Sequence, residues 1–120
     1  MKKKKIILIS MVSILIIIMA ILFISLLNNK TFFKNTYIGV QNQKIFIPKY
    51  SYFKEECCMT AAIFYSVKSE QKLAKEIENY MSEFEYFDND ETYGYQKGDL
   101  FIQSYEVINN GLYRKIIITY

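Results

Sequence analysis

Residues 6–27 read IILISMVSILIIIMAILFISLL and decide the architecture of the chain. Ser10, Ser13 and Ser25 are the only polar residues in this stretch, which contains no charged residue, proline or glycine. As an α-helix it would be about 33 Å long, which matches a hydrocarbon core about 30 Å thick. A serine is tolerated there because its hydroxyl can donate to a carbonyl of its own helix. The sequence therefore predicts a transmembrane helix over residues 6–27, with the lipid bilayer as its partner.

A cleaved signal peptide is the competing interpretation of this segment. Its apolar region usually has only about 7–15 residues and ends in small residues at the cleavage site. The apolar run here is longer, and the residues around its end, Ser25-Leu26-Leu27-Asn28-Asn29, lack the small-x-small pattern. We therefore expect an uncleaved anchor, and release of the domain by cleavage stays the alternative.

Lysines on the two sides of this segment indicate its orientation. Lys2–Lys5 precede it, whereas only Lys30 and Lys34 lie just beyond it. Because positive charge favours the cytoplasmic side, residues 1–5 are predicted to form a cytoplasmic tail. Residues 28–35 would be a short connector, and residues 36–120 a domain outside the cytoplasmic membrane.

The charge balance excludes one class of function. The net charge of +3 comes from the lysine tail, because residues 28–120 carry 11 basic against 12 acidic side chains. A domain without excess cations cannot neutralise phosphates, so we expect no nucleic-acid binding. The chain also has no histidine, the commonest acid/base group and metal ligand. We expect no cofactor and no catalytic residues.

The first half of the domain contains three β-like runs. Thr36–Val40 and Lys44–Ile47 are separated by the polar residues 41–43, which predicts a hairpin. Pro48 would end the second run because it has no N–H for a sheet. Met59–Val67 is nine residues long and rich in β-branched and aromatic side chains, which favours a buried strand over a helix.

A helix is predicted after this run. Ser66 or Ser69 can cap it, with Glu70 and Gln71 in its first turn, and it should end near Tyr86. Apolar side chains recur at steps of three and four along it, which is typical of a helix with one buried face. These residues are Leu73, Ile77, Tyr80, Met81 and Phe84.

Three further β-like runs follow the helix: Thr92–Gln96, Leu100–Ile108 and Leu112–Tyr120. Asn110-Gly111 lies between the last two, and Asn-Gly is a strong signal for a hairpin of antiparallel strands. The predicted order ββ-β-α-βββ indicates an α+β fold class, with one helix packed on a mainly antiparallel β-sheet behind one N-terminal transmembrane helix.

Cys57-Cys58 is the most unusual local feature and a possible disulfide or redox site. Adjacent cysteines can bond to each other only with strain, so separate fates are expected, such as packing as small apolar side chains or an intermolecular disulfide. Two thiols without histidine do not make a tetrahedral zinc site. A catalytic cysteine would need a cation to lower its pKa, and Glu55 and Glu56 offset the nearby Lys54.

Tyrosines are the second candidate, as a possible ligand surface made by Tyr93, Tyr95, Tyr105 and Tyr113. A tyrosine ring offers apolar area and its hydroxyl a hydrogen bond, which suits sugars or peptides. The alternative is that the 11 tyrosines fill the edge of a small sheet. The chain is also rich in Ile, Lys, Asn and Phe, whose codons, like those of Tyr, are A/T-rich, so we expect a bacterial source.

An acidic cluster follows the predicted helix. Carboxylates of this kind can bind calcium, but residue 93, where an EF-hand loop starting at Asp88 would need glycine, is tyrosine. A solvated turn is the simpler interpretation. The cluster consists of Glu83, Glu85, Asp88, Asp90 and Glu91.

These features predict a small single-pass membrane protein whose domain is a non-enzymatic interaction module. An envelope protein would be its partner, with the chain acting as an accessory subunit, a sensor or an immunity-type protector. A membrane-tethered enzyme or thiol-redox protein that uses Cys57 or Cys58 is the alternative. The sequence does not identify a small-molecule ligand.

Overall fold

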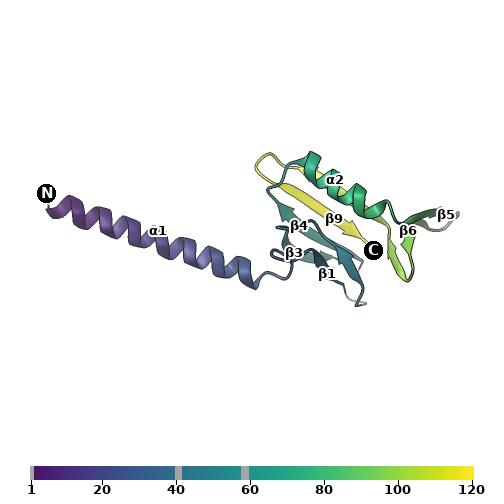
Figure 1. The fold of residues 1–120 in the computed structure, drawn as a ribbon, viewed down its shortest axis with the longest axis horizontal. Coiled ribbons are helices and arrows are strands. Elements are labelled where there is room, and N and C mark those ends of the chain that lie inside the picture. The colour runs from purple at the N-terminus through teal and green to yellow at the C-terminus, as the bar shows by residue number, and fades with distance from the viewer. Residues whose placement is uncertain (1, 40–41, 58–59) are drawn as a thin grey trace.

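The computed structural model describes residues 2–39, 42–57 and 60–120. Its first element, α1 (Lys2–Asn28), extends away from a small β-rich domain (Figure 1). None of its residues is buried, and α1 is the one helix in the described ranges that is long and apolar enough to cross a membrane. The Ser13 hydroxyl donates to the Ile9 carbonyl at 2.8 Å, which confirms that a serine can satisfy itself within this helix.

The domain is built from one helix and three antiparallel sheets within the described residues. The hairpin sheet contains β1 (Thr36–Ile38) and β2 (Lys44–Phe46). The central sheet has the order β3-β4-β9-β8, with bounds Tyr52–Cys57, Ala61–Ser66, Arg114–Thr119 and Ser104–Asn109. The third sheet has the order β5-β6-β7, with bounds Glu85–Asp88, Tyr93–Lys97 and Leu100–Ile102. The α+β fold class predicted from the sequence is confirmed.

The core lies on one face of the central sheet. Ala62 and Phe64 of β4 are fully buried, and they pair in register with Ile118 and Ile116 of β9, which are also fully buried. The intervening β4 residues point to the opposite face and are only half-buried. Burial therefore alternates along β4, as it does in a strand with one buried face, and the prediction of a strand at this position is confirmed. Met59, the predicted start of this strand, lies outside the described residues.

Two elements cover this buried face. The β1–β2 hairpin covers the β3–β4 half of the sheet. There the Tyr37 ring stacks on the Phe53 ring, with ring centres 5.5 Å apart, and packs edge-on against the Phe64 ring, with ring centres 5.3 Å apart. Helix α2 (Glu70–Met81) covers the β8 side and buries Leu73 and Ile77. The hairpin and helix predictions are thus both confirmed, although Val40 of the predicted first strand lies outside the described residues.

Helix α2 begins as predicted and ends earlier. Ser69 is the N-cap, and its Oγ accepts a hydrogen bond from the Lys72 N–H at 3.2 Å. The prediction that the helix extends to near Tyr86 is wrong. The Ser82 hydroxyl donates to the Asn79 carbonyl within the last turn, and residues 85–88 then pair with β6 as strand β5. All four residues of this segment pair in register with β6, and that pairing outweighs the helical spacing.

Three strand predictions also need correction. Strand β3 was not predicted, because Lys54, Glu55 and Glu56 give it a charged surface; β3 is an edge strand with a bulge at Lys54, where exposed charges are tolerated. The predicted strand Leu100–Ile108 is two strands, because the chain leaves β6 at Ile102 and joins β9 from Ser104. The final hairpin is antiparallel as predicted, but its second strand begins at Arg114 rather than Leu112.

The predicted connector is packed into the domain. The Asn29 side chain bonds both backbone groups of Phe53: its Nδ2 donates to the carbonyl at 3.1 Å, and its Oδ1 accepts from the N–H at 2.9 Å. Thr31 is fully buried, and its hydroxyl donates to the Ser51 carbonyl at 2.8 Å. These bonds fasten the exit of α1 to the start of β3.

Candidate functional site: a tyrosine-lined groove

A groove lies between helix α2 and the third sheet, with a volume of about 760 Å³. Helix α2 and the residue after it supply Ala74, Ile77, Glu78, Met81 and Ser82. Strands β5, β6 and β8, with Gln103 just before β8, supply the opposite wall, which consists of Tyr86, Tyr93, Tyr95, Gln103, Ser104, Tyr105 and Val107. Its surface thus combines aliphatic side chains, four tyrosines and a few polar groups, a composition common in binding sites.

Strand pairing in the third sheet positions these tyrosines. Tyr93 and Tyr95 are two residues apart in β6 and therefore share a face. Tyr86 of β5 lies opposite Tyr95 in register, and their rings are 5.2 Å apart. Tyr86 and Tyr93 are more than half exposed, so they offer ring area that no part of the described domain covers.

Gly94 supports the other face of the same sheet. It lies between Tyr93 and Tyr95 in β6, opposite Phe87, whose ring packs 5.5 Å from that of Phe101. A Cβ atom at Gly94 would be 2.6 Å from the Phe101 ring and 3.0 Å from the Ile102 carbonyl oxygen. The absence of a side chain at residue 94 allows Phe101 to cover the strand.

Gly94→Ala should therefore loosen the third sheet. The added methyl group displaces Phe101, and overpacking of this kind costs about 1–3 kcal/mol of unfolding free energy. Thermal unfolding of the full chain in detergent micelles would measure the loss. Gln96→Ala, at an exposed position of the same strand, is the control and should change the midpoint little. Equal midpoints for Gly94→Ala and the parent would contradict this packing.

Carboxylates are concentrated in and beside the third sheet. Lys97 pairs with Glu83, and the hydrogen bond from Lys97 holds the pKa of Glu83 below its usual value and raises the pKa of Lys97. Lys97 is the one basic residue between positions 83 and 102. The remaining acidic side chains there are exposed: Glu85, Asp88, Asp90, Glu91 and Asp99. This end of the domain is therefore strongly acidic.

Tyr105 lines the groove but has a structural role as well. Its hydroxyl donates to the Phe46 carbonyl at 2.8 Å, which joins β8 to β2. Burial raises the pKa of Tyr105 far above its usual value, so the hydroxyl stays protonated and keeps this bond. Its ring is available to a ligand, whereas its hydroxyl is already used.

Tyr113 does not belong to this groove. It packs edge-on against Tyr65 at 5.0 Å, and Tyr65 alternates with the buried Phe64 and so lies on the opposite face of the central sheet. Of the four tyrosines predicted to form a ligand surface, the structure brings together Tyr93, Tyr95 and Tyr105. Tyr86, which sequence reasoning placed at the end of the helix, joins them, and the alternation in Glu85-Tyr86-Phe87-Asp88 is the signal that could have revealed it.

Cys57 lies away from the groove. Cys57 is exposed at the end of β3, where it pairs in register with Ala61 of β4. Cys58 lies outside the described residues. Within the ranges that the structure describes, no three side chains of His, Cys, Asp or Glu come close enough together to hold a metal ion.

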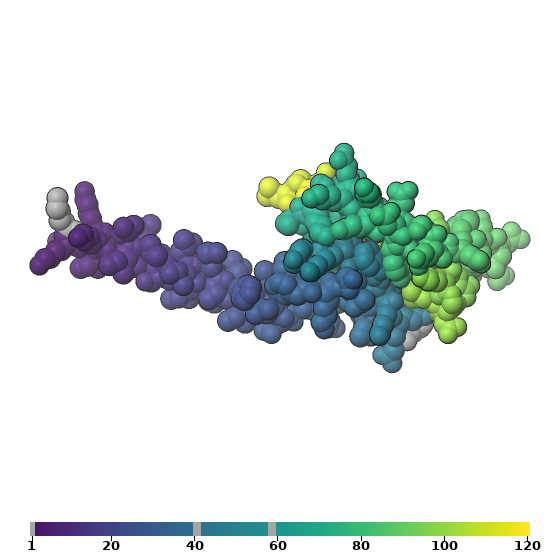
Figure 2. Space-filling model, viewed as in Figure 1, coloured from purple at the N-terminus to yellow at the C-terminus, as the bar shows by residue number. Residues whose placement is uncertain are grey.

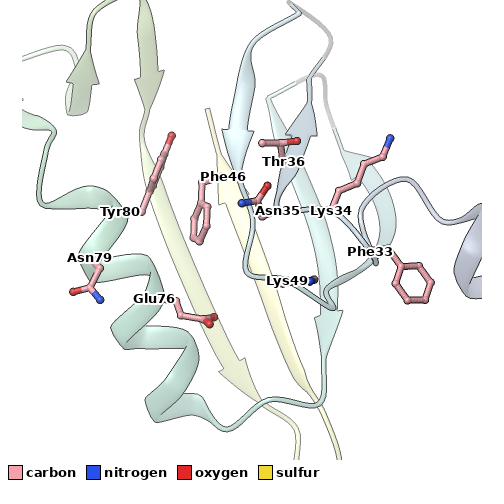
Figure 3. A pocket seen from close by; sticks show the side chains of 9 residues that line it. All are labelled: Phe33, Lys34, Asn35, Thr36, Phe46, Lys49, Glu76, Asn79 and Tyr80. Atoms are coloured by element: carbon pink, nitrogen blue, oxygen red, sulfur yellow. The ribbon is translucent and has the colours of Figure 1, made fainter.

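A second cavity, of about 830 Å³, separates α2 from the residues that follow α1 (Figure 3). The stacked rings of Phe46 and Tyr80, 4.7 Å apart, lie between its two sides. Glu76 and Asn79 come from α2, whereas Lys34, Asn35, Thr36 and Lys49 come from the opposite side. Burial raises the pKa of Tyr80. Sequence reasoning placed none of these residues in a site, because it assigned them to separate segments: the connector, the first two β-like runs, the stretch after these runs and the helix.

Comparisons with protein-family models, with curated proteins and with solved structures found no match for this chain.

Proposed function

We propose that the chain is a single-pass membrane protein that presents a non-enzymatic protein-interaction module at the outer face of the cytoplasmic membrane. Helix α1 is long and apolar enough to cross a bilayer, which supports anchoring. Lys2–Lys5 favour a cytoplasmic start of the chain and an external domain. The protein would serve an envelope partner as an accessory subunit, a sensor or an immunity-type protector.

The observation that carries this proposal is the tyrosine-lined groove. Exposed tyrosines provide rigid contact area at little cost in conformational entropy, and they are enriched at protein interfaces. The aliphatic floor, which includes Met81 and Val107, accepts an apolar side chain. Because Glu78 lines the groove and the third sheet beside it carries exposed carboxylates, the complementary ligand is a basic segment of a partner protein that also carries an apolar anchor.

Site-specific photo-crosslinking in cells tests this function. A photoreactive phenylalanine analogue at Tyr86 of the full-length protein should give one specific adduct with an envelope protein. The same analogue at Tyr52, a half-buried tyrosine of the edge strand β3, is the matched control and should not give that adduct. Absence of an adduct from Tyr86, or identical adducts from both positions, would overturn the proposal.

A thiol-redox or enzymatic function that uses Cys57 and Cys58 is the competing hypothesis. The exposure of Cys57 at the end of β3 is the observation that favours it. Cys57→Ser combined with Cys58→Ser would abolish such a function. If the groove binds the partner, the same pair of changes should leave both the cellular function and the crosslink from Tyr86 intact, so the two hypotheses predict opposite effects on function.

A further inference from the structure

Three segments meet at the end of the domain from which α1 leaves. They are the residues after α1, the loop between β4 and α2, and the turn between β8 and β9. Figure 1 shows the β4–α2 loop and the yellow β8–β9 turn on the side of the domain that α1 approaches, whereas β5 and β6 lie at the far end. In Figure 2 the yellow atoms of the turn likewise project toward the α1 side.

Aromatic rings connect α1 to the first two segments. The ring centres of Phe23, in α1, and Phe33 are 6.3 Å apart, and those of Phe33 and Tyr50 are 6.4 Å apart. The ammonium group of Lys68, in the β4–α2 loop, lies 5.9 Å from the centre of the Tyr50 ring. A continuous surface therefore runs from the apolar helix to this loop.

Arg114 fastens the third segment to the second. Its Nε donates to the Lys68 carbonyl at 2.7 Å, and one Nη donates to the Val67 carbonyl at 2.9 Å. Its other Nη donates to the Gly111 carbonyl at 3.0 Å. One guanidinium group thus holds the β4–α2 loop beside the β8–β9 turn.

The tips of these two loops are apolar and exposed. Leu112 is 90% exposed and Val67 is 77% exposed, the highest values for large apolar side chains in the described part of the domain. Phe33 and Tyr50 are about two-fifths exposed beside them. Exposed aliphatic tips together with aromatic rings and cations are the composition that favours the boundary between lipid headgroups and hydrocarbon.

The distribution of charge along the chain also favours an orientation in which the end near the exit of α1 faces the membrane. Residues 28–75 contain eight lysines and three acidic residues, whereas residues 76–113 contain nine acidic residues and one lysine. Lys34, Lys49, Lys68 and Arg114 lie near the exit of α1, and the carboxylates of the third sheet lie at the far end. An anionic lipid surface attracts the first group and repels the second.

We propose that this end of the domain, formed by Phe33, Tyr50, Val67, Lys68, Leu112 and Arg114, rests on the outer leaflet of the bilayer that α1 spans. Its partner is an anionic phospholipid surface. Val67 and Leu112 insert at headgroup level, and Lys34 and Lys49 contact lipid phosphates, since Lys68 pairs with Glu76 at 3.1 Å and Arg114 donates to carbonyls of the two loops. The bonds of Asn29 and Thr31 to β3 hold the domain in this position, so the tyrosine-lined groove faces away from the membrane. This inference rests on α1 crossing the membrane, as in the proposed function.

Tryptophan fluorescence tests the proposal, because the chain contains no tryptophan. Three single-tryptophan variants of the full chain would be reconstituted in vesicles of phosphatidylglycerol and phosphatidylcholine, with and without bromine on the acyl chains. The tryptophan of Tyr113→Trp lies next to Leu112 and reports on the proposed membrane-facing end. The tryptophan of Tyr93→Trp reports on the far end of the domain, and that of Phe23→Trp reports on α1. Bromine should reduce the emission intensity of Phe23→Trp and Tyr113→Trp. It should leave the emission intensity of Tyr93→Trp unchanged.

Leu112→Ser in the Tyr113→Trp background is the second variant, and it should fold normally because Leu112 is 90% exposed and contributes little to the packing of the domain. Bromine should quench the tryptophan of this double variant much less than that of Tyr113→Trp alone. Tyr113→Trp alone should also lose most of its quenching in vesicles made only of phosphatidylcholine. Quenching of Phe23→Trp without quenching of Tyr113→Trp would overturn the membrane-facing end and leave the anchor intact. No quenching of Phe23→Trp would instead overturn the anchor. Equal quenching of Tyr113→Trp and Tyr93→Trp would contradict the orientation.

Discussion

Phe64→Ala is expected to destabilise the domain more than any other single change considered. Phe64 is fully buried in β4, and its ring meets those of Tyr37 and Phe53. Removing a buried phenylalanine ring costs about 3–5 kcal/mol, because the apolar contacts are lost and a cavity remains. Since small domains are stable by only about 5–15 kcal/mol, much of the stability would disappear.

Thermal or urea unfolding of the full chain in detergent micelles, followed by near-ultraviolet circular dichroism of the tyrosines, would measure this loss. Tyr86→Ala removes an exposed ring and is the control, with an expected change well below that of Phe64→Ala. An unfolding free energy for Phe64→Ala within about 1 kcal/mol of the parent would mean that the core is not centred on β4.

Asn29→Ala should produce the second largest loss. The Asn29 amide replaces a neighbouring strand for Phe53, since it bonds both the N–H and the carbonyl of that residue. Alanine leaves both groups unsatisfied in a partly buried position, and each unsatisfied group costs about 1–3 kcal/mol. The variant should also free the domain to move relative to α1.

Asn79→Ala is the matched control, because Asn79 is an exposed asparagine on α2 whose backbone, not its side chain, makes the hydrogen bond to Ser82. Amide hydrogen exchange should be faster at Phe53 in Asn29→Ala and unchanged there in Asn79→Ala. If Asn29→Ala left the exchange rate of the Phe53 amide unchanged, the connection between α1 and β3 would have to be discarded.

The sequence was informative wherever one periodicity dominated a segment. The stripe that contains Leu73 and Ile77 predicted α2. Ser66 and Ser69 were both candidate caps, and the structure uses Ser69. The length of Met59–Val67 and its β-branched and aromatic content predicted the strand that appears in the structure as β4. These patterns work because burial of one face is the main source of stability for a single element.

Prediction failed where pairing between distant segments determined the structure. The charges of β3 are tolerated only because it is an edge strand, and a single sequence does not show which strand lies at an edge. The change of partner near Gln103 splits one apolar run into β7 and β8 for a similar reason. At Tyr86, pairing with Tyr95 outweighs a helical pattern that extends to Phe84.

The candidate site was partly predictable on the same grounds. Tyr93 and Tyr95 share a face because they are two residues apart, and this spacing is visible in the sequence. Their association with Tyr105 and Tyr86 depends on how three strands pair, and so does the separation of Tyr113. The cavity beside Phe46 and Tyr80 brings together residues more than thirty positions apart and gave no local signal.

Membrane topology is the most direct test of the account. Single cysteines would be introduced at Asp90, an exposed residue between β5 and β6, and at Lys3, in a background that carries Cys57→Ser and Cys58→Ser. A membrane-impermeant maleimide should label Asp90→Cys on intact cells and Lys3→Cys only after permeabilisation. The reverse pattern, with Lys3→Cys labelled on intact cells and Asp90→Cys protected, would place the domain in the cytoplasm and contradict a module at the outer face of the membrane.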